Sequence, residues 1–416
     1  MAFEAHIYGD RLIVEHHACI VDGVPAVWAG NRYDVGLDGV ERALLGMEKR
    51  LTERNRREVY SYIRLQAPEK APAPPYLAAF SNGVLDMRSG GMVPIDPEHH
   101  RIFNTIPHEY RADAYDARTD AFLEEVSCGD AAIRANLEET VGLCLYRSNA
   151  YGRMVLLLNS QGSNGKSMFI KALRAALGAE NTASLDVRTI GMRFMAGQLA
   201  GKLANLGDDI SNDTLSGDAM SVVKKIVTGE RMFTDTKGVK GFEFTPYCTM
   251  VFSANDMPRM KDYGNGVMRR LHPIPFNAVF SKGAGNLDPH LEEKITSKAA
   301  SEYMLRLGVE GIQRVLGNDG MTPNDASRDI VQQVRLDNDS ILAWITDCCI
   351  NPSTFIKRSS KDVHREYTEW CRDSGRMPKS ATALNAWLLN TYGIDRKSMR
   401  FPSGVSMGYY DPCADE

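Results

Sequence analysis

Residues 154–167 read "MVLLLNSQGSNGKS", an apolar run followed by small polar residues, one lysine and one serine. A short apolar run of this kind is typical of a buried strand in a parallel sheet. Small residues after the strand allow successive backbone N–H groups to point inward at phosphate oxygens. The helical pattern "SMFIKALRAALG" follows, with Gly178 as its expected end. This order of strand, loop and helix predicts a phosphate-binding loop.

Individual residues of this loop have separate expected roles. Lys166 can reach the β- and γ-phosphates of a nucleotide, and the Ser167 hydroxyl can hold Mg²⁺. Ser160 stands where the usual loop pattern opens with glycine, which is costly if that position needs a positive φ. The alternative, a chance Gly-Lys-Ser in a turn, does not explain the strand before it and the helix after it. The expected ATP-binding residues are Gly162, Ser163, Asn164, Gly165, Lys166 and Ser167.

Two later apolar runs end in polar residues. "KLANLGDDI" (202–210) ends near Asp208 and Asp209, and "CTMVFSANDMP" (248–258) carries Asn255. Adjacent acids at a strand end can deliver one carboxylate to Mg²⁺ and the other to an attacking water. We assign Asp208 to the metal and Asp209 to the water, although the two roles can be exchanged. The Asn255 carboxamide can orient that water or contact the γ-phosphate. Taken alone, both segments are also typical of a solvated strand end or a turn.

A compact cationic pair, Arg269 and Arg270, lies in "NGVMRRLHPIPF" (265–276). One interpretation is an arginine finger that stabilises the transition state of phosphoryl transfer. The other is a pair of surface salt-bridge donors.

Composition and charge bound the class of protein. At 416 residues the chain is long enough for two or three domains. With 49 basic and 53 acidic residues it has no global basic field, so any DNA contact must come from local lysines and arginines. No apolar run is long enough to cross a bilayer, and the first residues do not resemble an export signal. The eight scattered cysteines lack a Cys-x-x-Cys pair, which predicts reduced thiols in a cytoplasm and argues against a structural zinc site.

The pattern of apolar residues divides the chain into an α/β core with flanking regions. Strands alternate with helices from Met154 to Phe276, which predicts a largely parallel sheet. The tail shows three helical patterns and then short segments around Pro402, which outline either a winged helix or a plain helical cap. The expected divisions are a mixed α/β accessory domain (1–115), a helical segment (116–150), the ATPase core (151–316), a linker (317–328) and a C-terminal DNA-binding domain (329–416).

Four features follow one another along the chain: the phosphate loop, the adjacent acids Asp208 and Asp209 (the double acid), Asn255 at a strand end, and the arginine pair. This order resembles that of the superfamily III helicases of phages, plasmids and DNA viruses. The similarity is greatest to the D5-like primase-helicase group, whose loop reads close to Gly-x-Gly-x-Asn-Gly-Lys-Ser; "SQGSNGKS" departs from that pattern at Ser160 alone. The segments "YLAAFSNGVLDMRSG" and "DNDSILAWITDCC" also resemble flanking regions of these proteins. The resemblance therefore extends from about Asp38 onward. A primase domain does not fit in the region before Asp38, so primer synthesis is not predicted.

The resemblance implies an AAA+-like P-loop ATPase core that uses ATP and Mg²⁺. It implies a homo-oligomeric ring, a hexamer, that moves 3′-to-5′ along one DNA strand with ATP bound between subunits and the arginine supplied by the neighbour. Pore contacts in the family come from a hairpin, here expected at "MFTDTKGVKGFEF" (232–244), where Lys237 and Lys240 flank Gly238 and can meet DNA phosphates. Solvated turn lysines are the alternative.

The leading hypothesis is an ATP-driven helicase that replicates phage or mobile-element DNA in the bacterial cytoplasm. It would act on single-stranded and forked DNA beside a separate primase or polymerase. A P-loop kinase would not explain Asn255 together with the late arginine pair. A DNA-binding initiator or loader that uses ATP as an assembly switch is the second hypothesis, since it needs the same phosphate loop.

Overall fold

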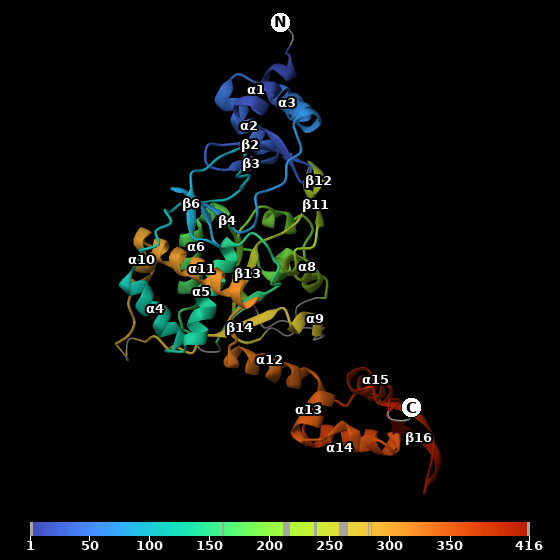
Figure 1. Ribbon diagram of the computed structural model, residues 1–416. Coiled ribbons are helices and arrows are strands. Elements are labelled where there is room, and N and C mark those ends of the chain that lie inside the picture. The colour runs from blue at the N-terminus through green and yellow to red at the C-terminus, as the bar shows by residue number, and fades with distance from the viewer. Residues whose placement is uncertain are drawn as a thin grey trace. The chain divides into compact units, whose positions relative to one another are not determined.

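The computed structural model describes residues 3–159, 162–210, 217–236, 239–257, 265–281, 283 and 285–413. The backbone alone is described for residues 208–210, 217, 218, 235, 236, 239–242, 265 and 267. The chain forms two compact units, Met1–Ser327 and Arg328–Glu416. The first unit holds both N-terminal sheets and the large sheet, and the second holds the C-terminal helices and a hairpin (Figure 1).

The N-terminal part of the first unit combines three helices with two small sheets. Its elements are α1 (Ala5–Glu15), β1 (Cys19–Val21), β2 (Val24–Trp28), β3 (Tyr33–Val35), α2 (Gly36–Met47), α3 (Glu53–Gln66), β4 (Leu77–Phe80), β5 (Gly83–Asp86), β6 (Gly91–Val93) and β7 (Thr105–Ile106). The sheets have the orders β1-β2-β3 and β6-β5-β4-β7. The hairpin around Gly23 lies between β1 and β2. The apolar run before that hairpin is helical, with Leu12 buried and Val14 exposed.

A five-stranded sheet organises the rest of the first unit. The elements here are α4 (Ala117–Ser127), α5 (Ala131–Leu145), β8 (Met154–Leu158), α6 (Lys166–Leu177), β9 (Thr182–Ala183), α7 (Val187–Ile190), β10 (Ala204–Ile210), α8 (Gly217–Thr228), β11 (Met232–Thr236), β12 (Val239–Phe244), β13 (Thr249–Ala254), α9 (Asn265–Met268), β14 (Leu271–Pro275), α10 (Leu291–Ile295) and α11 (Lys298–Asn318). The large sheet has the order β14-β8-β13-β10-β9, and every neighbouring pair in it is parallel. All five residues of β8 are buried between β14 and β13. The predicted α/β architecture with a parallel sheet is confirmed.

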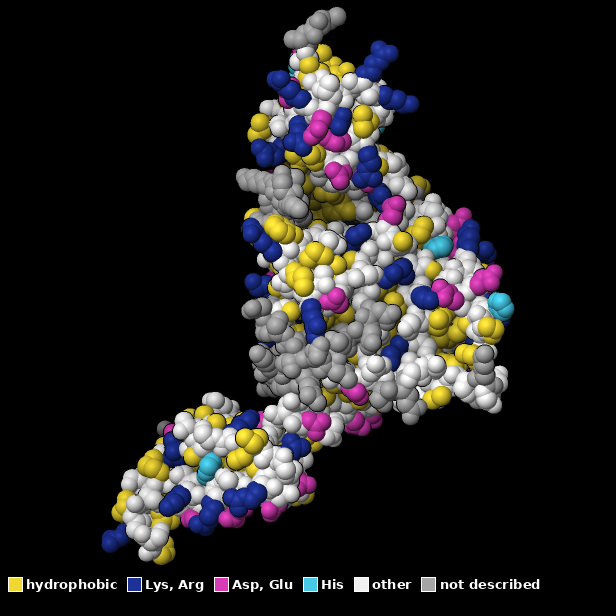
Figure 2. Space-filling model, turned by 180° about the vertical axis from the view of Figure 1, so that it is seen from behind, with side chains coloured by type: hydrophobic (Ala, Val, Ile, Leu, Met, Phe, Trp, Pro, Cys, Tyr) yellow, Lys and Arg dark blue, Asp and Glu magenta, His cyan; other side chains and the backbone are white. Residues whose placement is uncertain are grey.

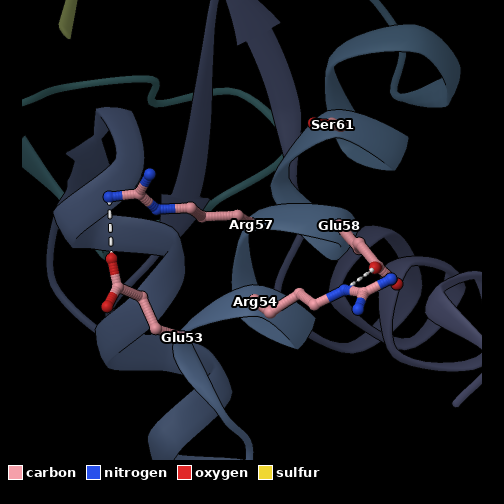
Figure 3. A pocket seen from close by; sticks show the side chains of 5 residues that line it. All are labelled: Glu53, Arg54, Arg57, Glu58 and Ser61. Carbon is pink, nitrogen blue, oxygen red and sulfur yellow. Dashed lines mark hydrogen bonds and ion pairs between the residues drawn. The ribbon is translucent and has the colours of Figure 1, made fainter.

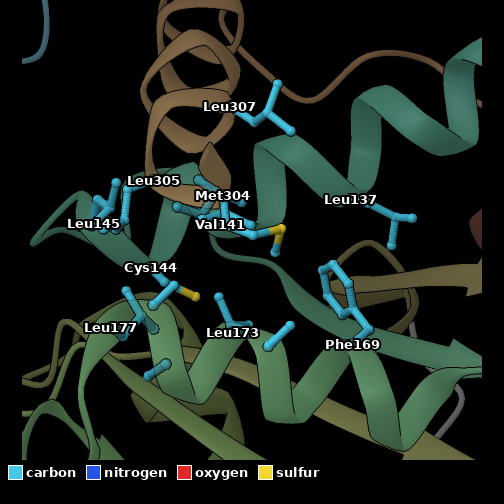
Figure 4. Close-up of a cluster of buried hydrophobic side chains, with 14 of the residues drawn as sticks. Leu137, Val141, Cys144, Leu145, Phe169, Leu173, Leu177, Met304, Leu305 and Leu307 are labelled. Atoms are coloured by element: carbon cyan, nitrogen blue, oxygen red, sulfur yellow. The ribbon is translucent and has the colours of Figure 1, made fainter. Parts of the chain in front are cut away.

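The core of the first unit lies where α5, α6 and α11 meet (Figure 4). Its labelled side chains are Leu137, Val141, Cys144 and Leu145 on α5, Phe169, Leu173 and Leu177 on α6, and Met304, Leu305 and Leu307 on α11. The buried apolar residues of α6 recur at steps of three and four positions, which gives this helix one apolar face. α5 and α11 approach closely at a pair of glycines, since a Cβ on Gly142 would lie 2.4 Å from the Gly308 carbonyl oxygen. The helix that follows the phosphate loop is therefore fixed along its length.

The second N-terminal sheet packs on this same core. Phe80, Leu85 and Ile106 belong to the cluster that contains the core residues of α5 and α6. Part of the expected accessory domain (1–115) thus shares a hydrophobic core with the large sheet.

The segment 232–244 forms the expected hairpin. β11 and β12 pair antiparallel from Met232–Phe244 to Thr236–Val239. Thr234 of β11 is buried, and an added Cβ on Gly197 would lie 3.0 Å from its side chain. The base of the hairpin is thereby packed on the segment that precedes β10.

Beyond the part of α12 that lies in it, the second unit contains three further α-helices and a terminal hairpin among its described residues. Its elements are α13 (Ser340–Asp347), α14 (Ser360–Asp373), α15 (Ala381–Tyr392), β15 (Asp395–Phe401) and β16 (Gly404–Tyr410). Trp344, Phe355, Tyr367 and Tyr409 are fully buried and form the aromatic centre of its core. The strands pair antiparallel around Pro402 and Ser403, so the predicted order of helices and hairpin is observed.

The segment 317–328, which its composition predicts to be a linker, connects α11 to α12 (Asp325–Asn338). α11 continues to Asn318, and α12 begins within the first unit and continues into the second. Asn324 and Ser327 are buried, and the Ser327 hydroxyl donates to the carbonyl oxygen of Pro273. The side chains of Asn324 and Ser327 therefore bond the part of this segment that lies in the first unit to its core.

Candidate functional site

The carboxyl edge of the parallel sheet brings several predicted site residues together. Strand pairing aligns Leu158 of β8 with Ala254 of β13, and Ala254 with Ile210 of β10. Asn159 and Asn255 therefore follow adjacent strand ends. Carboxyl ends of parallel strands are where α/β sheets place ligands.

Backbone conformation shapes the loop before α6. Ser163 and Gly165 have φ of 57° and 90°, in the left-handed region. A Cβ on Gly165 would lie 2.7 Å from Val126 Cγ1 and 3.2 Å from Phe122 Cε2, so glycine is required there both for its φ and for space. The Phe280 N–H donates to the Ser163 carbonyl oxygen at 2.8 Å. The loop is thus held from two sides at the start of α6.

The side chain of Lys166, the first residue of α6, is buried. It is 7% exposed, and its Nζ donates to the carbonyl oxygen of Asn159 at 2.9 Å. The Asn164 side chain is 4% exposed, and its Oδ1 lies 3.5 Å from the Lys166 backbone nitrogen. The Asn159 side chain in turn donates to the Phe276 carbonyl oxygen, which joins the ends of β8 and β14.

Asn159 was not predicted from the sequence. Its position directly after the apolar run is the one available signal, and its contact with Lys166 is made by the backbone, which carries no residue-specific pattern. Gly162, Ser163 and Ser167 are exposed at the N-terminal end of α6, where unpaired backbone N–H groups favour anions. Ser160 lies outside the described residues.

The double acid lies at an irregularity of the sheet. Gly207 pairs with Phe252 and Ile210 with Ala254, so β10 has one more residue than β13 over this interval. The extra residue falls at Asp208 and Asp209, which changes the alternation of faces at the carboxyl edge. Their backbone is described and their side chains are not. The structure therefore places both acids on the strand beside Asn255 without defining which one faces the phosphate loop.

The arginine pair lies at the opposite edge of the same sheet. Arg269 and Arg270 precede β14, and the Met154 N–H at the start of β8 donates to the Arg270 carbonyl oxygen at 2.7 Å. Arg269 is exposed, whereas Arg270 is partly buried and donates to the Gly266 carbonyl oxygen. At about 3.3 Å per strand residue, six steps separate Arg270 from Phe276 by roughly 20 Å. The structure does not bring the arginines to the phosphate loop of their own chain.

The structure describes only part of the segment that carries the two predicted DNA-binding lysines. Lys237 lies outside the described residues, and Lys240 belongs to β12 with its backbone alone described. Phe233 on β11 is 63% exposed, and Arg231 pairs with Glu243 at 2.9 Å across the hairpin.

A hollow of about 580 Å³ lies on the surface of α3, and none of the predicted site residues lines it (Figure 3). Its lining side chains are Glu53, Arg54, Arg57, Glu58 and Ser61. Both arginines are paired within the helix, Arg54 with Glu58 at 3.1 Å and Arg57 with Glu53 at 2.8 Å. These ion pairs neutralise the surface, and nothing in the hollow resembles a catalytic arrangement.

Surface charge is mixed on the face seen in Figure 2, where Lys and Arg side chains are interspersed with acidic ones. Within the described ranges, no group of three or more His, Cys, Asp and Glu side chains could hold a metal ion. None of the helices in the part of the chain that the structure describes is both long and apolar enough to span a bilayer.

A parallel sheet with a lysine-bearing loop at its carboxyl edge is consistent with an α/β nucleotide-binding core. Residues 42–128 match the family described as "D5 N terminal like", and residues 158–270 match a "Family of unknown function (DUF5906)". The "Putative helicase L207/L206" of Acanthamoeba polyphaga mimivirus is 26% identical over 216 residues, which is 50% of this chain and 22% of that protein. The chain thus matches about a fifth of that relative's length. These matches support the resemblance to D5-like primase-helicases.

Solved structures of the NrS-1 C-terminal region share the fold. One apo structure has a TM-score of 0.55 at 12% identity and covers 96% of this chain and 97% of that one. A second, of residues 305–718, has the same TM-score and identity and covers 99% and 100%. The likeness extends over both units of the chain.

Proposed function

We propose that this chain is the motor of an ATP-dependent DNA helicase of superfamily III that replicates phage or mobile-element DNA. The observation that supports this most is the division of predicted residues between the two edges of one sheet. The loop with Lys166, the double acid and Asn255 share the carboxyl edge, and the arginine pair lies at the amino edge. A ring of identical subunits can bring one edge against the other, which a single chain cannot.

The residues at the carboxyl edge suit a bound nucleotide. The left-handed turn at Gly165 aims the N-terminal end of a twelve-residue helix at the space before it, where a phosphate fits. Backbone N–H groups of Gly162 to Gly165 and the Lys166 ammonium would hold the phosphates of ATP. Ser167 and Asp208 would hold Mg²⁺, which when bound neutralises charge on the β- and γ-phosphates.

The remaining residues act on the attacking water and on developing charge. Asp209 accepts the proton of the water, and Asn255 orients it beside the γ-phosphate. Arg269 or Arg270 of the neighbouring subunit stabilises the charge that develops in transfer. Each site in the AAA+-like ring is then completed by two chains.

DNA contacts come from two places. Lys237 and Lys240 at the β11–β12 hairpin contact the phosphates of a single strand in the pore of a hexamer that translocates 3′-to-5′. The second unit, with its three helices and hairpin, binds DNA as a winged-helix-like domain. The "putative helicase" description of the mimivirus relative supports a role in DNA processing. A separate primase or polymerase supplies primers in the host cytoplasm.

Strand displacement on a forked DNA tests this proposal. We expect the full chain to separate the strands with ATP and Mg²⁺ and to fail with a non-hydrolysable ATP analogue. Lys166→Ala is the matched control, which should fail with either nucleotide. Displacement with the analogue, or none with either nucleotide, would favour an ATP-switched replication initiator or loader.

A further inference from the structure

A buried polar cluster joins α5, β14 and the segment before α12. Asn136 of α5 lies at its centre and is fully buried. Its Oδ1 lies 3.1 Å from His272 Nε2 on β14 and 3.1 Å from Asn324 Nδ2. Its Nδ2 donates to the Thr322 carbonyl oxygen at 2.9 Å. One amide therefore contacts two segments that are far apart in sequence.

The cluster is closed by a buried carboxylate. Glu139 is fully buried; its Oε2 accepts from Asn136 Nδ2 at 3.1 Å and from the Thr322 N–H at 2.9 Å. Since both Asn136 amide hydrogens meet acceptors, its Oδ1 must accept, and His272 donates through Nε2. Burial lowers the pKa of His272 to about 4, so the ring is neutral at pH 7. The amide uses all of its hydrogen-bonding capacity, which fixes its orientation.

This cluster is directly connected to the arginine pair. His272 follows Arg270 by two residues at the start of β14. On the other side, Arg153 donates to the Arg269 carbonyl oxygen, and the Met154 N–H donates to that of Arg270 at 2.7 Å. The backbone that carries the arginines is thus held by β8 on one side and by Asn136 on the other.

The second connection runs to α12. The Ser327 hydroxyl donates to the Pro273 carbonyl oxygen on β14, and Asn324 Oδ1 accepts from the Ser327 N–H at 3.2 Å. α12 begins at Asp325 and continues into the second unit. The first turn of the helix that leads to the second unit is therefore bonded to the strand that follows the arginines.

We propose that Asn136, Asn324 and Ser327 form a latch whose positioning residues fix the amino end of β14, so that Arg269 and Arg270 meet the neighbouring subunit in the geometry that ATP hydrolysis requires. This inference rests on the proposed arginine donation between subunits. A displacement of about 1 Å at a catalytic group can cost on the order of a hundredfold in rate, so a few buried hydrogen bonds suffice for this role.

The variant Asn324→Ser/Ser327→Ala is designed to remove the hydrogen bonds of the latch and to leave the rest of the first unit intact. Serine at 324 can still cap α12 but is too short to reach Asn136, and alanine removes the bond to Pro273. We expect kcat for ATP hydrolysis to fall on the order of ten- to a hundredfold, with the KM for ATP unchanged. Ser297→Ala is the control, because Ser297 caps α11 through the Ala300 N–H and, within the described residues, makes no hydrogen bond to β14.

Mixed rings assign the defect to one side of the interface. Latch-variant chains mixed with Lys166→Ala chains should regain hydrolysis, since an intact phosphate loop then faces latched arginines. Chains that carry both Lys166→Ala and the latch substitutions should fail to restore Arg269→Ala/Arg270→Ala chains. Plain Lys166→Ala chains should restore them. Labelled subunits show that mixed rings form.

Three results would overturn the latch. The first is a kcat of the latch variant equal to that of Ser297→Ala. The second is no recovery of ATP hydrolysis when latch-variant chains are mixed with Lys166→Ala chains. The third is equal restoration of Arg269→Ala/Arg270→Ala chains by Lys166→Ala chains with and without the latch substitutions. Failure of the plain pair to recover would instead refute arginine donation itself and the latch with it. If the double variant does not fold, Ser327→Ala is compared with Ser327→Thr, which keeps the hydroxyl. Equal kcat in those two would also refute the latch.

Discussion

Replacing Gly165 by alanine should destabilise the first unit as well as impair the phosphate loop. The position has a φ of 90°, where a side chain costs roughly 1–2 kcal/mol. The added Cβ would lie 2.7 Å from Val126 Cγ1 and 3.2 Å from Phe122 Cε2. Both neighbours are fully buried, and overpacking of this kind costs about 1–3 kcal/mol. The sum is about 2–5 kcal/mol, or roughly 3–7 °C in Tm for a unit that spans Met1–Ser327.

The measurement is thermal unfolding of the nucleotide-free protein, followed by circular dichroism. Gly162→Ala is the matched control, because no described atom lies within 4 Å of an added Cβ and its φ is not positive. We expect the control to unfold within about 1 °C of the wild type, as surface substitutions usually do. Equal Tm values for the two variants would refute the left-handed, closely packed conformation at Gly165.

Other substitutions test separate parts of the site. Lys166→Ala should abolish ATP binding, whereas Asp209→Asn should bind ATP without hydrolysing it; tight binding with normal phosphate release in the Lys166 variant would contradict the loop assignment. Lys237→Ala with Lys240→Ala should leave DNA-independent hydrolysis intact. It should also make the log–log salt dependence of single-strand binding shallower, by about one unit of slope per lost phosphate contact. An unchanged slope would mean that both lysines are solvated and do not contact DNA. Since burial lowers the pKa of His272 to about 4, its protonation opposes folding, so stability is fully present above pH 6.5 and is lost as the pH falls toward 4. His272→Gln should remove about 2 kcal/mol of the stability difference between pH 7 and pH 5 in urea unfolding, and an unchanged difference would contradict the burial of a neutral ring.

The strands and helices of the large sheet could be predicted because their signals are local. The apolar run 154–158 has the length of a buried strand, and the buried positions of α6 recur with helical spacing. A short apolar run such as "RLIV" at 11–14 fits both a strand and a helix until its neighbours are known. There Leu12 is fully buried, Ile13 packs partly buried against the same core, and helix α1 continues to Glu15.

Long-range contacts could not be predicted from the sequence. Asn136 and Asn324 look like ordinary polar residues of a helix and a loop, and only the fold brings them together. "GNDGMTPNDAS" has the composition of a linker, yet the same small polar side chains make the bonds that fix it. The extra residue of β10 at the double acid likewise depends on pairing with β13, which no local pattern encodes.

The most direct test of a site shared between subunits is ATP hydrolysis by an equal mixture of Lys166→Ala and Arg269→Ala/Arg270→Ala chains. Each variant alone should be nearly inactive, since loss of the arginine costs on the order of a thousandfold or more. In randomly mixed rings about a quarter of the interfaces join an intact loop to an intact arginine pair, so hydrolysis should return to about a quarter of the wild-type rate per subunit. If labelled subunits show mixed rings and hydrolysis does not return, the arginines act within their own chain or are structural, and the proposed ring mechanism is wrong.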